Sequence, residues 1–328
     1  MRLTISEAED LVVSILLRSK VSEDNARCVA RALVAAEAAG QGGHGLRRVP
    51  TYAAQAIAGK VDGFAIPAAT KTAEAVLRVD AAFGFAYPAL DLAVAELAPL
   101  AAKTGIALAA IHRSHHAGVM GLTVERFAEQ GLVALMVANT PAAMAPWGGR
   151  TALFGTNPIA FAAPLPDADP IVIDLAMSKV ARGKIVTAKQ KGLAIPADWA
   201  LDADGHPTTD AAKAVEGTMM PLGDAKGAAL ALMVEILAAG ITGAQYAFEA
   251  SSLLDDKGPP PALGQTIIVI DPKASGGVDM LPRLSLLAEM IGSDPGARLP
   301  GKRGATQRRA ALANGLELED DIMQLLGA

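Results

Sequence analysis

The segment GGHGLRR carries residue types suited to acid–base chemistry on a small molecule. His44 lies between glycines, and Arg47 and Arg48 follow it. A histidine titrates near neutral pH and can give or take a proton at a carbon-bound oxygen or nitrogen. A nearby guanidinium can hold a carboxylate through two parallel hydrogen bonds. The segment therefore favours a site for a small carboxylic acid, and the alternative is a surface turn with two solvated arginines.

A second histidine pair, His115 and His116 in RSHHAG, follows a short apolar strand predicted over residues 106–112. Strand ends that open into loops often carry site residues. A zinc site needs three or four ligands at suitable spacing, and the five histidines and one cysteine of this chain do not show it. We therefore expect no metal, a packing role for His112, and a simple turn at His206.

Three further positions could hold a substrate or a cofactor. Asn157 offers an amide in GTNP, at a turn that Pro158 stiffens. Asp174 ends a predicted strand, and backbone amides after it could hold a ribose or a phosphate; its alternative role is a helix N-cap. Lys226 precedes a predicted helix whose N-terminus favours anions, and its alternative is a solvated lysine.

Helix ends and strand ends must position these residues. An amphipathic helix is predicted over 5–19, and a second helix stops at Gly40, just before His44. Residues 226–243 predict the strongest helix, apolar almost all round and therefore buried. Strands are predicted over 72–80, 106–112, 131–139, 155–164, 170–178 and 264–272. The pattern indicates an α/β or α+β fold with a mixed sheet.

Several common site motifs are missing from the sequence. No G-x-G-x-x-G follows a strand, and no phosphate-binding G-x-x-x-x-G-K-[ST], G-x-S-x-G or C-x-x-C occurs. A cofactor, if bound, would not lie on a Rossmann fold.

Composition sets the outer limits of function. The chain has 328 residues, of which 52% are hydrophobic and 4% aromatic, with a net charge of −5 and no basic stripe, so nucleic-acid binding is not expected. The N-terminus lacks a basic leader, and no apolar run is long enough to span a membrane. A single cysteine, Cys28, suits a reducing compartment, and we expect a soluble cytoplasmic protein without membrane contact.

Taken in order, several motifs resemble one family. GGHGLRRVPTY, RSHHAG, GTNPIAFAAP, IDLAMSKVARGKI, KGAALALMVEILAAGITG and RLPGKR are similar to the malate/L-lactate dehydrogenase-like (type 2) oxidoreductases. Within that family, VDAAFGFAYPAL, FAEQGLVAL and GQTIIVIDP resemble the Δ1-piperideine-2-carboxylate/Δ1-pyrroline-2-carboxylate reductase branch.

The resemblance implies a fold and an activity. The fold would be a non-Rossmann α/β structure with a mixed, largely antiparallel sheet and helical N- and C-terminal regions. The activity would be hydride transfer from NADPH, or NADH, to C2 of a small carboxylic acid, most simply a cyclic imine, in a homodimer. An L-2-hydroxyacid dehydrogenase and a catalytically silent metabolite-binding homologue are the alternatives.

The resemblance also assigns roles by position. The implied catalytic residues are His44 and His116, and the implied substrate contacts are Arg48, Thr156 and Asn157. The implied cofactor contacts are Asn139, Asp174, Leu175, Ala176, Met177, Ser178, Lys226 and Gly227. Lys179, Arg182 or Lys184 could contact a 2′-phosphate. The implied division joins 1–65, 125–165 and 285–328 in a helical substrate and dimerisation region, and 66–124 with 166–284 in a cofactor-binding domain.

The chain departs from the family pattern at one position. The family usually has Ser-His-Gly where this sequence has Gly43-His44-Gly45. A serine hydroxyl there could relay a proton or bind the substrate heteroatom, so its absence bears directly on the choice between an imine and a hydroxyacid.

Overall fold

A seven-stranded sheet forms the centre of the computed structural model, which describes residues 1–276 and 280–327. Its strands are β2 (Ala68–Ala73), β3 (Val76–Asp80), β4 (Ile106–Ser114), β5 (Val133–Ala138), β6 (Ile159–Ala163), β7 (Ile171–Leu175) and β10 (Leu263–Ile270). Their order is β2-β3-β4-β10-β5-β6-β7, and every neighbouring pair is antiparallel except β3 and β4. The expected mixed, largely antiparallel sheet is confirmed.

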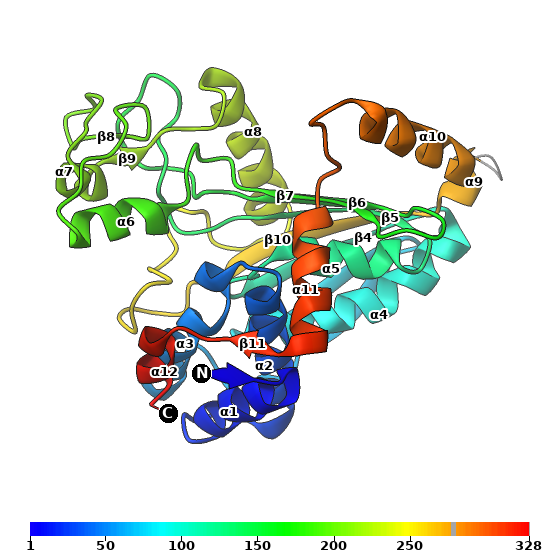
Figure 1. The fold of residues 1–328 in the computed structure, drawn as a ribbon, viewed down its shortest axis with the longest axis horizontal. Helices are drawn as coiled ribbons and strands as arrows, with labels where there is room; N and C mark the ends of the chain where they lie inside the picture. Colours follow the sequence, from blue (N-terminus) through cyan, green and yellow to red (C-terminus); the bar gives the residue numbers. More distant parts are fainter. Residues whose placement is uncertain (277–279, 328) are drawn as a thin grey trace.

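Helices cover both faces of this sheet (Figure 1). On one face, α4 (Ala86–Thr104) and α5 (Met120–Ala128) place Leu97 and Phe127 in a core with Met136 of β5. On the other face, α8 (Ala225–Glu235) and a π-helical turn, Ile236–Gly240, pack against Val137. Met136 and Val137 point to opposite faces because side chains alternate along a strand.

The prediction that the helix over 226–243 is buried all round is wrong. Leu230, Leu232 and Ile236 are 43%, 47% and 50% exposed. The physical reason is that α8 has the sheet on one side, whereas its other side faces outward in the single chain.

The two ends of the chain build a helical region together. There, α1 (Ile5–Leu17), α2 (Glu23–Ala38), α3 (Val49–Ala58) and α12 (Asp320–Leu326) share one apolar core. The short strands β1 (Arg2–Leu3) and β11 (Leu316–Glu317) pair beside it, so the termini lie close together (Figure 1). The expected helical N- and C-terminal regions are confirmed. The remaining C-terminal helices are α9 (Pro272–Gly276), α10 (Met280–Ser293) and α11 (Lys302–Asn314).

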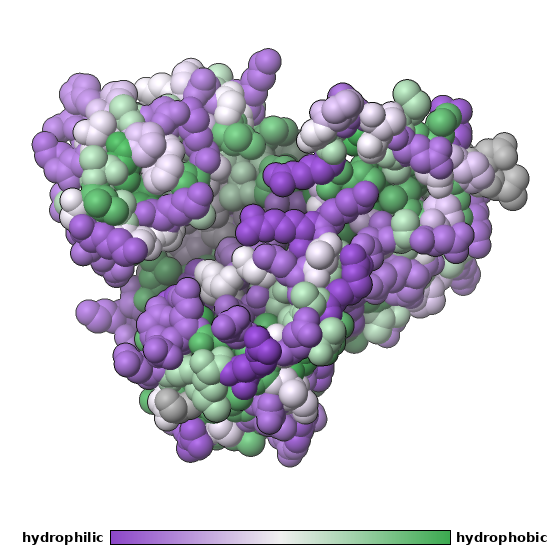
Figure 2. Space-filling model, in the orientation of Figure 1, coloured by the Kyte–Doolittle hydropathy of each residue, from purple (hydrophilic) through white to green (hydrophobic). Residues whose placement is uncertain are grey.

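A small lobe follows β7. It contains α6 (Arg182–Gln190), β8 (Ala200–Leu201), α7 (Ala211–Glu216) and β9 (Thr218–Met219), with its own apolar core around Met144, Met177 and Ile185. The surface is hollowed where this lobe, the helical region and the sheet meet (Figure 2). This hollow is called the recess below.

The strand register brings the candidate site residues to one edge of the sheet. The end of β4 pairs with the start of β10, at Ser114 and Leu263, and the end of β5 lies opposite the start of β6. Leu175, at the end of β7, pairs with Ile159 at the start of β6. The loops that carry His116, Asn139 and Asn157 therefore leave the sheet on the same side, at the edge where β7 ends with Asp174 and Leu175.

The observed sheet differs from one predicted strand and bears on the predicted division of the chain into two regions. The strand expected over 72–80 is a hairpin, because the chain reverses after Ala73 and returns as β3. The sheet also takes β5 and β6 from a segment that was expected in the helical region, and the division into substrate and cofactor regions stays a prediction. Within the described residues, no helix is both long and apolar enough to cross a membrane.

Candidate active site

Four side chains form a continuous line of hydrogen bonds near this edge, called here the histidine–tyrosine chain. Nδ1 of His44 lies 3.2 Å from Nε2 of His116, and Nδ1 of His116 lies 2.7 Å from the Tyr52 hydroxyl. That hydroxyl lies 3.2 Å from the hydroxyl of Tyr87. The two predicted catalytic histidines therefore touch each other, although 72 residues separate them in sequence.

A tight connection between α2 and α3 holds His44 in place. Gly42–His44 and Leu46–Arg48 form two short 3₁₀ turns. A side chain at Gly45 would lie 3.0 Å from the backbone nitrogen of Glu37 and 2.3 Å from its carboxylate, so this position requires glycine. The Glu37 carboxylate accepts the backbone N–H of Leu46 at 2.9 Å, which fixes the turn on α2.

Burial favours the uncharged forms of all four side chains of the histidine–tyrosine chain at neutral pH. Burial, and then the charge of Arg48, lowers the pKa of His44 to about 4 and lowers the pKa of His116 well below its usual value. Burial raises the pKa of Tyr52 and raises that of Tyr87 well above its usual value. Nε2 of the partly exposed His44 has no hydrogen-bond partner among the described residues, so this nitrogen is free to meet a substrate.

The structure separates the roles of the two neighbouring arginines. Arg47 pairs with Asp321 at 2.8 Å and with Glu319 at 3.0 Å, so it ties the turn to the C-terminal segment. Nε of Arg48 donates to the carbonyl of Gly43 at 2.9 Å. Its two terminal nitrogens have no partner in the described part of the chain, and they remain available for a carboxylate. Arg48 is therefore the better candidate for a substrate contact.

Asp174 meets the loop that carries the histidines. Its carboxylate accepts the backbone N–H of Gly121 at 2.7 Å, at the start of α5. Asp174 is exposed as a residue, but neighbouring protein atoms partly desolvate its carboxylate and raise the pKa. The Gly121 hydrogen bond opposes this shift. Leu175 is 39% exposed, and Ala176 is half-buried. These residues present a polar and apolar surface at the end of β7.

Two predicted site residues lie inside the protein. Asn157 is completely buried and donates to Glu235 at 2.7 Å and to the Ala231 carbonyl at 2.9 Å. Asn139 donates to Glu235 at 3.1 Å. The Glu235 carboxylate also accepts the backbone N–H of Ala247 at 2.7 Å. This carboxylate cluster anchors the loops after β5 and before β6, and the geometry gives both asparagines a positioning role.

The remaining predicted residues divide between exposed and packed positions. Lys226 is exposed at the start of α8, whereas a side chain at Gly227 would lie 1.8 Å from the Leu222 carbonyl, so Gly227 is needed for packing. Met177 is buried, and its N–H donates to the carbonyl of the half-buried Thr156 at 2.7 Å. Ser178 is also buried and donates to the Val180 carbonyl at 2.9 Å. Backbone contacts thus join the predicted substrate loop to the predicted cofactor loop.

The basic residues considered for a 2′-phosphate also differ. Lys179 already pairs with Asp198 at 2.8 Å. Arg182 is half-buried and reaches the Ala142 carbonyl at 3.5 Å, whereas Lys184 is exposed on α6. Their role in cofactor choice stays a prediction.

Sequence reasoning missed Tyr52, Tyr87, Lys60 and Glu235. The chain has three tyrosines in all, and two of them are buried side by side with their hydroxyls in contact. Glu235 is the single charge within the otherwise apolar run 227–243, which was a readable signal for a buried acceptor. Lys60 has no exposed side-chain surface, and its ammonium contacts Asp255 and the Lys257 carbonyl, 2.5 Å away. It anchors the loop after α8 to the end of α3.

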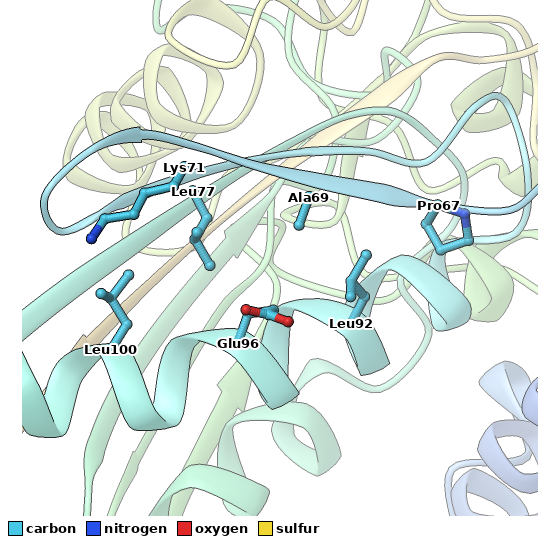
Figure 3. A pocket seen from close by; sticks show the side chains of 7 residues that line it. All are labelled: Pro67, Ala69, Lys71, Leu77, Leu92, Glu96 and Leu100. Carbon is cyan, nitrogen blue, oxygen red and sulfur yellow. The ribbon is translucent and has the colours of Figure 1, made fainter.

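A surface pocket lies apart from these residues. It has a volume of about 400 Å³ between the β2–β3 hairpin and α4 (Figure 3). Its lining is Pro67, Ala69, Lys71, Leu77, Leu92, Glu96 and Leu100. None of the predicted site residues lines it, so it plays no part in the site described here.

Known proteins are similar to this chain over almost its whole length. The family model described as malate/L-lactate dehydrogenase matches residues 3–327. The chain belongs to the malate/L-lactate dehydrogenase family. It is 47% identical to a (2R)-3-sulfolactate dehydrogenase (NADP(+)) of Chromohalobacter salexigens, over 99% of this chain and 97% of that protein.

Imine reductases of the same family are also similar. A Δ1-pyrroline-2-carboxylate/Δ1-piperideine-2-carboxylate reductase of Pseudomonas putida is 41% identical, over 98% of this chain and 95% of that protein. The crystal structure of Δ1-piperideine-2-carboxylate reductase from Pseudomonas syringae superposes with a TM-score of 0.94 at 37% identity, covering 99% and 98% of the two chains. The expected family and fold are confirmed.

Proposed function

We propose that this member of the malate/L-lactate dehydrogenase family is a cytoplasmic NADPH-dependent oxidoreductase that reduces C2 of a small carboxylic acid. The preferred substrate is the cyclic imine Δ1-pyrroline-2-carboxylate or Δ1-piperideine-2-carboxylate. The observation that carries the proposal is that Nε2 of His44 and the terminal nitrogens of Arg48 both lack partners among the described residues, while the Arg48 charge acts on His44. A proton donor and a carboxylate partner are thus available in the same turn. The named reductases at 41% and 37% identity support the imine.

Arg48, His44 and His116 have separate roles in the proposed reaction. Arg48 holds the substrate carboxylate, which fixes C2 relative to His44. His44 is neutral and donates the proton on Nε2 to the substrate nitrogen as the amine forms. His116 accepts or supplies the proton on the opposite side of the His44 ring and keeps that ring oriented, as second hydrogen bonds to catalytic histidines generally do.

The exposed residues at the end of β7 and the start of α8 fit a nicotinamide dinucleotide. The exposed Asp174 carboxylate suits ribose hydroxyls, and exposed Lys226 at the uncapped start of α8 suits a phosphate. Leu175 and Ala176 offer apolar contact to a ring. When bound, NADPH supplies the hydride. The relative named for NADP(+) supports NADPH over NADH.

A substrate panel tests the proposal. NADPH and NADH oxidation is followed by absorbance with both cyclic imines, pyruvate, oxaloacetate and 3-sulfopyruvate as oxidants. We expect the cyclic imines to turn over fastest with NADPH. His44→Ala should lower kcat by about 10²–10⁴-fold because the proton donor is lost, with an unchanged melting temperature. No turnover of either imine, or an active His44→Ala protein, would reject the assignment.

A second candidate is a 2-hydroxyacid dehydrogenase, favoured by the sulfolactate dehydrogenase at 47% identity. A neutral His44 is also the form that accepts a proton from a hydroxyl group. Position 43 is relevant to both substrates. No atom of the described residues lies within 4 Å of where a Gly43 side chain would begin, so there is open space beside His44. Fast reduction of 3-sulfopyruvate with slow imine turnover would establish this candidate instead.

The exposed apolar side of α8 supports a homodimer. Leu230, Leu232, Met233, Ile236 and Ile241 are each more than two-fifths exposed there. Helix α10 likewise exposes Leu286, Leu287 and Met290 and has no buried residue among those described. Apolar surface of this extent usually marks an interface. Light scattering of the purified chain should give twice the monomer mass, and a monomer mass would contradict the proposal.

A further inference from the structure

The outer end of the histidine–tyrosine chain reaches a second cavity. Tyr87 lines a cavity of about 470 Å³ between α2, α4 and α5, together with Cys28, Asp91, Ala117, Glu125 and Arg308. His44, His116, Arg48 and Asp174 do not line it. One end of the histidine–tyrosine chain is therefore Nε2 of His44, and the other end is Tyr87, which lines a different cavity.

The four groups can all point their protons in one direction. If Tyr87 donates to Tyr52, Tyr52 donates to Nδ1 of His116, and Nε2 of His116 donates to Nδ1 of His44, then every hydrogen bond is made. The proton of His44 is then on Nε2, which faces no protein partner among the described residues. This is the tautomer that the proposed reduction requires.

We propose that His116, Tyr52 and Tyr87 are a proton path that replaces the proton given up by His44 from water in the second cavity. The path rests on the proposed role of His44 as proton donor. It matters during the reaction, when substrate and cofactor in the recess keep bulk water away from His44. Tyr52 and Tyr87 then act in proton supply, in addition to holding His116.

The proton balance is simple. In the reduction, Nε2 of His44 loses a proton to the substrate nitrogen, and each bond along the path moves one proton inward. A proton from cavity water enters at the Tyr87 hydroxyl, so one solvent proton is consumed and no path member becomes charged. After product leaves, water in the open recess reprotonates Nε2, and the same movements in reverse return a proton to the cavity.

The electrostatics agree with a concerted path. The pKa values of His44 and His116 are lowered and those of both tyrosines are raised, chiefly by burial. Burial thus disfavours a charge on each member, and this favours joint movement of the protons. The cavity end is lined by ionic groups, since Arg126 pairs with Asp91 at 2.6 Å and Arg308 with Glu125 at 2.6 Å.

Removal of the Tyr87 hydroxyl distinguishes a role in proton supply from a role in holding His116 in place. Tyr87→Phe keeps the ring and leaves the Tyr52–His116 bond intact. It should lower kcat about tenfold, raise the solvent deuterium isotope effect on kcat, and leave KM for NADPH and imine within about twofold. Tyr246→Phe is the matched control, because Tyr246 is the third tyrosine and its hydroxyl has no hydrogen bond within the described residues. It should behave as wild type.

Two results would overturn the path. The first is an unchanged kcat and isotope effect in Tyr87→Phe; a rise in KM or a loss of stability without an isotope effect would show a structural role instead. The second applies even if Tyr87→Phe does not fold: in mixtures of H2O and D2O, wild-type kcat should vary along a curve, because several protons move together. A straight line would indicate a single proton and reject the path.

A measurement without turnover distinguishes failure of the path from failure of the proposed function. In a His44→Phe background, the recess end of the path is blocked, and ¹⁵N NMR follows exchange of the His116 ring N–H with solvent. Adding Tyr87→Phe should slow this exchange about tenfold, as expected when the remaining route to water is cut. Equal exchange rates would reject the path whether or not the imines are substrates.

Discussion

Two buried polar clusters lie beside the same sheet edge, and they differ in how their hydrogen bonds end. The carboxylate cluster is closed, since both asparagines and the Ala247 N–H end on Glu235 inside the protein. The histidine–tyrosine chain is open at one end at Nε2 of His44, and it ends on the other side at Tyr87, which lines a cavity. A closed cluster can only hold loops in place, whereas an open one can exchange protons with its surroundings.

The two clusters also respond to acid with opposite sign. Burial lowers the folded-state pKa values of the histidines below the ordinary 6.5, so their favourable contribution is complete above that pH and is lost as the pH falls. Burial raises the pKa of Glu235, so its ionised form is a cost at neutral pH that protonation relieves. Acid should therefore weaken the first cluster before it disturbs the second.

The largest expected effect comes from removing the Glu235 carboxylate from the closed cluster. Glu235→Leu leaves the Ala247 N–H without an acceptor and removes one bond from each asparagine, so the free energy of unfolding should fall by about 2–4 kcal/mol. Urea unfolding measures this loss. Glu249→Leu is the control, because Glu249 accepts one backbone N–H, from Tyr246, at an exposed turn, and its loss should stay below about 1 kcal/mol. Equal stabilities for the two variants would show that Glu235 does not hold the loops.

Much of this arrangement was readable from the sequence, and the rest depended on contacts between distant residues. The apolar strand before RSHHAG and the glycines around His44 predicted where both histidines would lie, because periodicity and turn chemistry are local. The contact of His44 with His116 spans 72 residues and follows from the sheet edge, which no local pattern specifies. Asn157 was expected to face the substrate, but the structure turns it inward to Glu235 because the β5–β6 and α8 segments meet there. Likewise, the apolar sequence of α8 predicted burial without showing that one side stays exposed in the described part of the chain.

The smallest expected effect concerns the pH dependence of stability at His115, a buried residue beside the histidine–tyrosine chain. His115 is buried against Tyr52 and Phe85, and both its ring nitrogens lack hydrogen-bond partners among the residues that the structure describes. Burial, followed by the charges of Lys60 and Arg48, lowers its pKa to about 3. His115→Leu should leave stability near about pH 8 within about 1 kcal/mol, since no hydrogen bond is lost. Near about pH 5 the variant should be more stable than wild type by about 2 kcal/mol, because roughly 1.4 kcal/mol is at stake for each pH unit below the unfolded pKa. His206→Leu is the control: its side chain is 78% exposed, and its stability should follow the wild-type pH dependence. Parallel curves for His115→Leu and wild type would mean that His115 is protonated as readily in the folded as in the unfolded chain, and the contrast between the two clusters would then rest on His44 and His116 alone.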